Sequence, residues 1–282
     1  MMTIGFIGAG KVGNSLGSYL LEANSTKIMG YFSRSQDSAR QAAENTQSSV
    51  FLDPKELIRA SDIIFLTVPD DAIAKVALEL SCGGAPLDLK IFCHSSGSQS
   101  SEILEPLMQK GARGASLHPL MAIPDKNSSK LLQKAIFTLE GTRDATGPIL
   151  ELLRPLGNKV FPIKKEHKTL YHCAASFVSN FSVALAQVGL EMFEACELRE
   201  AAQGLYELML LNASNILHLG PEKALTGPVE RGDTGTIEAH LSVLEGKTLQ
   251  IYNLLASKLL EIASRKHPTR DYTPLARLLE KN

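Results

Sequence analysis

The chain has 282 residues, of which 44% are hydrophobic and 21% are charged, and its formal net charge is -1. This length predicts two globular domains, and the near-neutral charge excludes the basic field that draws nucleic acid or anionic lipid. Trp is absent and aromatic residues make up 6%, so we expect no platform for stacked bases and no nucleic-acid partner.

Four cysteines, Cys82, Cys93, Cys173 and Cys196, lie far apart in the sequence. Their spacing suits neither a zinc site nor a disulfide framework, so reduced thiols and no metal are expected. The first residues, MMTIGFIGAG, lack the pattern of a signal peptide. No uninterrupted apolar run reaches the ~18 residues of a membrane span. These features predict a cytoplasmic protein without a membrane partner.

The first 160 residues alternate short apolar runs with amphipathic segments. The predicted strands are Thr3–Ile7, Ile28–Ser33, Ser49–Leu52, Asp62–Val68, Lys90–His94, Gly114–His118, Ile136–Leu139 and Lys159–Ile163. The predicted helices between them are Lys11–Glu22, Asp37–Glu44, Pro54–Ala60, Asp71–Leu80, Ser101–Lys110 and Thr146–Leu156. This alternation indicates βαβ units and a mostly parallel, doubly wound sheet, which defines an α/β Rossmann domain.

The pattern changes after Lys164, and long helical stretches replace the strands. They cover Tyr171–Glu194, Arg199–Gly220 and Ile237–Ala263, with a last short helix at Pro274–Leu279. We therefore predict two domains: residues 1–163 form the Rossmann domain, and residues 164–282 form an all-α domain.

The strongest local signal is Gly8-Ala9-Gly10-Lys11-Val12-Gly13, a GxGxxG pattern. It follows an apolar strand and opens a helix, which is the context that a dinucleotide fingerprint requires. Free N–H groups and the positive end of the helix dipole then face a diphosphate. The alternative is a glycine-rich turn without a ligand.

The second strand is followed by Ser33-Arg34-Ser35, without a carboxylate. An NAD-binding chain usually places an Asp or Glu near this point to hold the ribose hydroxyls. Arg34 can instead pair with a 2′-phosphate, and the two serines can donate hydrogen bonds to it. This favours NADP(H) as cofactor, the alternative being a solvated Arg in a turn.

Polar residues follow three later strands, at the sheet edge where ligands bind. Val68, Pro69 and Asp70 follow the DIIFLTV strand and are expected to contact the cofactor, although Asp70 or Asp71 can also cap the next helix. His94, Ser95 and Ser96 end one further strand, and His118 ends the next. We place His94 and Ser95 at the cofactor, and Ser96 and His118 at the substrate. A strand-end His can instead bind only a neighbouring loop.

These segments together resemble the superfamily of ketopantoate reductase, pyrroline-carboxylate reductase, imine reductases and prephenate dehydrogenase. More narrowly, GFIGAGKVG, YFSRS, IIFLTVPDD, HSSG, LHPLM and TGPVERGD resemble uncharacterised bacterial Rossmann proteins labelled NADP oxidoreductases. Their helical C-terminal half has no known function. The resemblance implies NADPH on the glycine loop and on Ser33-Arg34-Ser35. It also implies a helical domain, like the C-terminal domain of 6-phosphogluconate dehydrogenase, that pairs with its twin in a homodimer.

Two details of the resemblance concern the substrate. Gly114–Asp125 is similar to the prephenate dehydrogenase motif around its catalytic His, which implies a role for His118 and Pro119 near the substrate. A glycine of that motif is missing here, so prephenate itself is not implied. Ketopantoate reductase has a Lys and an Asn four apart on a comparable helix. Asn180 matches the Asn, but Ser176 stands where the Lys would be.

His172, Ser176 and Asn180 have i, i+4, i+8 spacing and form one polar stripe on an apolar helix. The stripe either binds and protonates a substrate or ties two domains together. Arg231, in the later Gly- and Pro-rich break, is a candidate clamp for an anionic substrate, and Asp233 or Thr234 is a candidate helix cap.

The sequence therefore predicts an NADP(H)-dependent oxidoreductase that transfers a hydride to or from a small carbonyl or imine metabolite. His118 or His172 would donate the proton, and Ser95, Ser96, Ser176 and Asn180 would orient the substrate. The alternative is an NADP-binding sensor without turnover.

Overall fold

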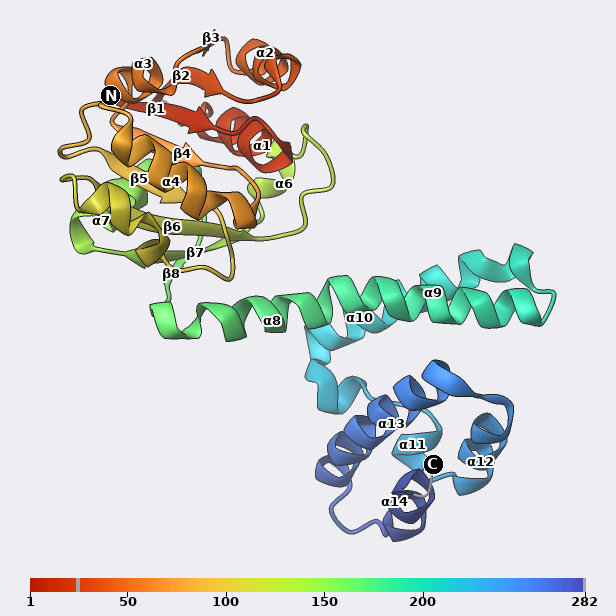
Figure 1. Cartoon of the computed structure of the whole chain (residues 1–282). Helices are drawn as coiled ribbons and strands as arrows, with labels where there is room; N and C mark the ends of the chain where they lie inside the picture. Colours follow the sequence, from red (N-terminus) through yellow and green to blue (C-terminus); the bar gives the residue numbers. More distant parts are fainter. Residues whose placement is uncertain (24–25, 281–282) are drawn as a thin grey trace. The chain divides into compact units, whose positions relative to one another are not determined.

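The computed structural model describes residues 1–23 and 26–280. The chain divides into two compact units, residues 1–180 and residues 181–282. The first unit contains an eight-stranded sheet, and the second is helical (Figure 1). The predicted fold class, an α/β Rossmann domain followed by helices, is confirmed.

The sheet of the first unit has the strand order β3-β2-β1-β4-β5-β6-β7-β8. The bounds are β1 Met2–Ile7, β2 Thr26–Phe32, β3 Ser49–Val50, β4 Ile63–Leu66, β5 Ile91–His94, β6 Arg113–Leu120, β7 Ile136–Gly141 and β8 Val160–Pro162. Every neighbouring pair is parallel except β6 and β7. The order reverses between β1 and β4, which is the switch point where such sheets bind ligands.

Helices cover both faces of this sheet, which is why β4 is buried along its whole length. The longer ones are α1 Lys11–Leu20, α2 Gln36–Asn45, α3 Pro54–Ala60, α4 Ile73–Cys82 and α7 Arg143–Leu153. The shorter ones are α5 Glu105–Met108 and α6 Ser129–Leu132, and the 3-10 turns are η1 Asp70–Ala72, η2 Ser101–Leu104, η3 Arg154–Leu156 and η4 Lys165–His167. The last helix of the unit is α8 Lys168–Val178.

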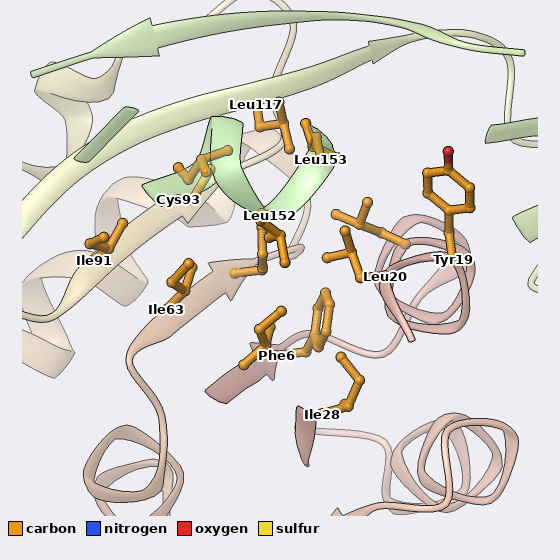
Figure 2. Close-up of a cluster of buried hydrophobic side chains, with 14 of the residues drawn as sticks. Phe6, Tyr19, Leu20, Ile28, Ile63, Ile91, Cys93, Leu117, Leu152 and Leu153 are labelled. Carbon is orange, nitrogen blue, oxygen red and sulfur yellow. The ribbon is translucent and has the colours of Figure 1, made fainter. Parts of the chain in front are cut away.

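Two hydrophobic cores lie on opposite faces of the sheet. One packs side chains of α1, α2 and α7 against the strands, and the other packs α3, α4 and α5. Figure 2 shows Leu20 of α1 and Leu152 of α7 converging on Phe6 and Ile63. This double layer fixes the carboxyl ends of β1, β4, β5 and β6, where the polar residues lie.

Local sequence explains where several elements begin. The Ser35 hydroxyl accepts a hydrogen bond from the Ser38 N–H and caps α2. Asp53 caps α3 in the same way, and Pro54 occupies the first helical position. The predicted helix over Ser101–Lys110 is instead the turn η2 followed by the four-residue α5.

The second unit contains α9 Asn180–Ala195, η5 Arg199–Ala201, α10 Ala202–Ala224, α11 Pro228–Arg231, α12 Thr234–Val243, α13 Gly246–Lys266 and α14 Thr273–Glu280. Its core joins α11, α12, α13 and α14. The single helix predicted over Ile237–Ala263 is wrong, because extended backbone at Glu245 and a positive φ at Gly246 separate α12 from α13. The Asp233 carboxylate caps α12, as one of the two cap candidates predicted.

One helix, Lys165–Ala195, is long and apolar enough to cross a membrane by length and composition, with a mean hydropathy of 1.4. Polar residues such as His172 and Asn180 interrupt its apolar run, which is why the sequence showed no uninterrupted span. A single helix of this kind is weak evidence for a membrane protein, and none of its most apolar window is buried in the structure.

Candidate functional site: a glycine cradle and a strand-end cluster

The glycine loop turns sharply between β1 and α1. Gly8 has a φ of +110°, and a Cβ there would lie 2.6 Å from the backbone of Thr67. A Cβ on Gly13 would lie 2.4 Å from the Gly8 carbonyl oxygen. The Thr67 hydroxyl donates to that same oxygen at 2.8 Å. Glycine is therefore required at both positions by close backbone approach.

Gly10 differs from these two glycines, because a Cβ there would meet nothing within 4 Å. It is the N-cap of α1, and no side chain caps this helix end. The first N–H groups of Lys11, Val12 and Gly13 are thus presented by the helix without a side-chain acceptor, in the arrangement that binds a phosphate.

A cavity of about 630 Å³ opens beside this loop. Gly8, Ala9 and Gly10 form one wall, and Val68 and Pro69 of the β4–η1 loop form another. Its remaining walls come from Ser33 and Arg34 after β2, from α3 and from α4. The volume is within the range of pockets that hold small ligands and cofactors, and its position is the switch point of the sheet.

Three cationic side chains line the cavity. Arg34 is exposed and lines it, together with Lys55 of α3 and Lys75 of α4. Lys75 pairs with Glu79 at 3.9 Å, whereas no ion pair within residues 1–23 and 26–280 engages Arg34. Sequence reasoning named Arg34 but missed the two lysines, because only the fold brings α3 and α4 to this wall.

A second group of polar residues lies at the ends of β5 and β6, and we term it the strand-end cluster. Its members are Asp70, Ser96, Ser116, His118, Lys168, Tyr171 and His172. The Ser96 hydroxyl donates to the Asp70 carboxylate at 2.5 Å. Since Pro69 lines the cavity and Asp70 follows it, the cluster adjoins the cavity at the β4–η1 loop. Asp70 therefore holds Ser96 and does not cap the following helix.

His118 lies in the part of β6 that extends beyond the end of β5. The His118 Nδ1 and the Tyr171 hydroxyl are 2.9 Å apart, and their rings meet edge to face. The His172 ring is 6.0 Å from the His118 ring, centroid to centroid. A Cβ on Gly97 would lie 2.5 Å from His172 and 2.8 Å from His118 Nε2, so only glycine leaves room for both rings.

The imidazole of His118 is held in its neutral form. Burial, and then the positive charge of Lys168 and the nearby His172, lower its pKa to about 4, while Asp70 acts in the opposite direction. A neutral imidazole can still donate one N–H, and the partner of the other nitrogen decides which. If Tyr171 donates to Nδ1, the proton resides on Nε2.

His94 has a structural role in the loop after β5. Its side chain is fully buried, its Nδ1 accepts from the Ser96 N–H at 3.2 Å, and its Nε2 is 3.1 Å from the Ser100 carbonyl. Burial lowers its pKa to about 4. Both ring nitrogens are thus used within the loop, and a contact between His94 and the cofactor stays a prediction.

The remaining predicted site residues are not gathered in the strand-end cluster. Ser95 is half-buried after β5, Ser176 is half-buried in α8, and Asn180 is exposed at the start of α9. Arg231 belongs to the second unit, where its exposed guanidinium is 3.8 Å from Asp233.

Sequence reasoning missed Lys168, because it began the helix at Tyr171. Lys168 is fully buried. Its ammonium donates to the Ser116 hydroxyl at 2.6 Å and to the Ser96 carbonyl at 3.1 Å. The spacing of Lys168, Tyr171 and His172 on one helix face was the signal that could have revealed it.

A glycine cradle, a cavity at the switch point and polar strand ends define a Rossmann-type architecture. Residues 1–119 match the Rossmann-like domain family, and residues 135–259 match a domain of unknown function, DUF2520. The chain thus combines a Rossmann-like domain with a DUF2520 C-terminal domain. No curated protein matches the sequence.

Solved structures share this architecture over most of their length. Protein TM1727 from Thermotoga maritima is 29% identical, with a TM-score of 0.73, and the match covers 93% of this chain and 99% of that one. The "putative NADP oxidoreductase BF3122 from Bacteroides fragilis" is 23% identical, with a TM-score of 0.75 and coverage of 92% and 98%. Plasmodium falciparum pyrroline carboxylate reductase, solved with NADP bound, is 16% identical, with a TM-score of 0.57 and coverage of 94% and 96%.

Proposed function

We propose that this protein is an NADP(H)-dependent oxidoreductase that transfers a hydride to or from a carbonyl or imine carbon of a small metabolite. The observation that carries the proposal is the uncapped start of α1, which opens onto a cavity of about 630 Å³ with Arg34 on its wall. The structural neighbours, which include a reductase solved with NADP, support the same class of activity.

Each wall of the cavity suits one part of the cofactor. The N–H groups of Gly10 to Gly13 fit a diphosphate, and Arg34, Ser33 and Ser35 fit the 2′-phosphate of the adenosine ribose. Val68, Pro69, Asp70 and Ser95 would contact the opposite half of the dinucleotide. When bound, the nicotinamide ring would supply or accept the hydride.

The chain's own residues would polarise the carbonyl or imine group, and the proton that completes its reduction would come from solvent. A neutral His118 with its proton on Nε2 can donate a hydrogen bond to a substrate oxygen or nitrogen, and Tyr171 fixes the ring through Nδ1. His172, at 6.0 Å from His118, is the second candidate. Ser96, Ser176, Asn180 and Arg231 remain candidates for orienting the substrate. We also propose a cytoplasmic homodimer formed through the helical unit.

The test is to measure NADPH oxidation, and in the reverse direction NADP⁺ reduction, over a panel of keto acids, aldehydes, linear imines and cyclic imines. Turnover of at least one class is the expected result. Tight NADPH binding without turnover of any class would favour an NADP-binding sensor. Absence of both binding and turnover would reject both functions.

A further inference from the structure

Lys168 is a fully buried cation that the proposed chemistry does not use directly. Its side chain has no exposed surface in this structure. A buried ammonium is strongly destabilising unless hydrogen bonds and opposite charges compensate it. Here the Ser116 hydroxyl and the Ser96 carbonyl accept from it, and Ser116 also donates to the Ser96 carbonyl at 3.2 Å.

These bonds join three elements at one point. Ser96 follows β5, Ser116 lies in β6 and Lys168 is the first residue of α8. Tyr171 and His172 follow Lys168 at i+3 and i+4, so they lie on the same helix face. The first turn of α8 is thereby fixed on the strand ends, which brings the Tyr171 hydroxyl to His118 Nδ1.

We propose that Lys168 is a positioning residue for His118: its ammonium fixes the first turn of α8 on β5 and β6, so that Tyr171 holds the imidazole in a single orientation and tautomer. The inference rests on the proposed function in one respect, because that function is what gives His118 its role. The geometry belongs to the first unit alone.

The charge of Lys168 acts on His118 as well. Lys168 and His172 of α8 oppose protonation of the imidazole, Asp70 of η1 favours it, and burial opposes it most strongly. Burial lowers the pKa of Lys168 itself, and Glu140 of β7 and Cys93 of β5 act in the opposite direction on that pKa. Removing the ammonium therefore should make protonation of His118 easier.

The test is an NMR titration of the imidazole nitrogens in the free protein, with the His118 signals assigned by their loss in His118→Gln. Lys168→Met keeps most of the side-chain volume without the charge or the donors. We expect the pKa of His118 to rise by about one unit, which is about tenfold more imidazolium at a given pH, and the nitrogen shifts to move toward a mixture of tautomers. Lys168→Arg should retain the low pKa of His118.

The matched control is Lys90→Met. The Lys90 ammonium also donates to a strand-adjacent carbonyl, that of Ser61 at 2.6 Å, but it lies at the other end of the sheet. Lys90→Met should therefore leave the His118 signals unchanged. A folded Lys168→Met protein with wild-type His118 signals would overturn the proposal.

If Lys168→Met does not fold, Ser116→Ala tests the positioning directly. It keeps the charge and removes the hydroxyl at 2.6 Å, so the tautomer signature of His118 should change while its pKa moves little. Unchanged nitrogen shifts in Ser116→Ala would also overturn the proposal. Because these titrations use the free protein, a failure to bind NADPH would reject the proposed function without affecting them.

Discussion

Arg34 is the residue on which the choice between the two nicotinamide dinucleotides rests. No carboxylate stands beside it after β2, and its guanidinium is exposed at the cavity wall. We predict that Arg34→Ala weakens NADPH binding about 10- to 100-fold, as expected for a lost charge-assisted contact, and leaves NADH binding nearly unchanged. Competitive fluorescence titrations measure both.

Arg40→Ala is the control for this prediction, because Arg40 lies on α2, which begins two residues after Arg34, and pairs with the exposed Asp37. Arg40→Ala should change neither the NADPH affinity nor the NADH affinity. An equal loss of NADPH and NADH affinity in Arg34→Ala would show that Arg34 does not recognise the 2′-phosphate.

His118 is predicted to affect turnover and not cofactor affinity. His118→Gln should lower kcat about 10²- to 10³-fold, the range of a lost polarising hydrogen-bond donor, with the Kd for NADPH changed less than threefold. The control is His240→Gln, since His240 also meets a tyrosine hydroxyl, that of Tyr252 at 2.9 Å, in the second unit. An unchanged kcat in His118→Gln would remove His118 from the mechanism.

His94, which is buried, and His118, which is half-buried, also predict how stability depends on pH. The pKa values of His94 and His118 are lowered to about 4 in the folded protein, whereas an unfolded His has a pKa of about 6.5. The unfolded chain binds more protons between these values. Stability is therefore complete above about pH 6.5 and declines as the pH falls toward 4.

Urea unfolding at pH 7 and pH 5 tests this dependence. We expect a free energy of unfolding lower by about 1–2 kcal/mol per histidine at pH 5. Some carboxyl groups also have lowered pKa values, such as those of Asp62 and Glu230. They titrate below the range from pH 5 to pH 7 that this experiment compares. Equal stability at the two pH values would contradict the lowered pKa values of both rings.

At the scale of elements, two substitutions in the glycine loop distinguish an effect on stability from an effect on NADPH binding. Gly13→Ala places a methyl group 2.4 Å from the Gly8 carbonyl oxygen, and we predict a loss of about 1–3 kcal/mol of stability. Gly10→Ala meets no neighbouring atom, so it should lose less than about 1 kcal/mol. Both should weaken NADPH binding at least tenfold, as measured by thermal unfolding and calorimetry. Full NADPH affinity in Gly10→Ala would argue against a diphosphate at this helix end.

Some of these elements can be predicted from the sequence and others cannot. The apolar run of β4, the GxGxxG turn and the Ser35 cap could be predicted, because each depends on residues close together in the sequence. The contacts of the Lys168 ammonium could not, since its partners Ser96 and Ser116 are 72 and 52 residues away in the sequence. The break between α12 and α13 was missed because Gly246 is a single glycine inside an otherwise helical pattern, which a helix can tolerate. The roles of Ser176, Asn180 and Arg231 stay predictions.

At the scale of the whole molecule, the exposed apolar surface of the helical unit predicts self-association. Leu217 of α10 is 80% exposed and Leu254 of α13 is 75% exposed, which is unusual for side chains that stay in water. We predict a dimer at micromolar concentration by analytical ultracentrifugation, and a shift toward monomer in Leu217→Glu. Leu52→Glu, at a residue that is 77% exposed in the first unit, should remain dimeric. A wild-type monomer would contradict the proposal.

The most direct test of the account is isothermal titration calorimetry of the purified full chain with NADPH and with NADP⁺. We predict saturable heat that fits one site per chain for at least one of the two forms, reduced strongly in Gly10→Ala. No detectable heat with either form would contradict dinucleotide binding at the start of α1, and with it the proposed oxidoreductase function.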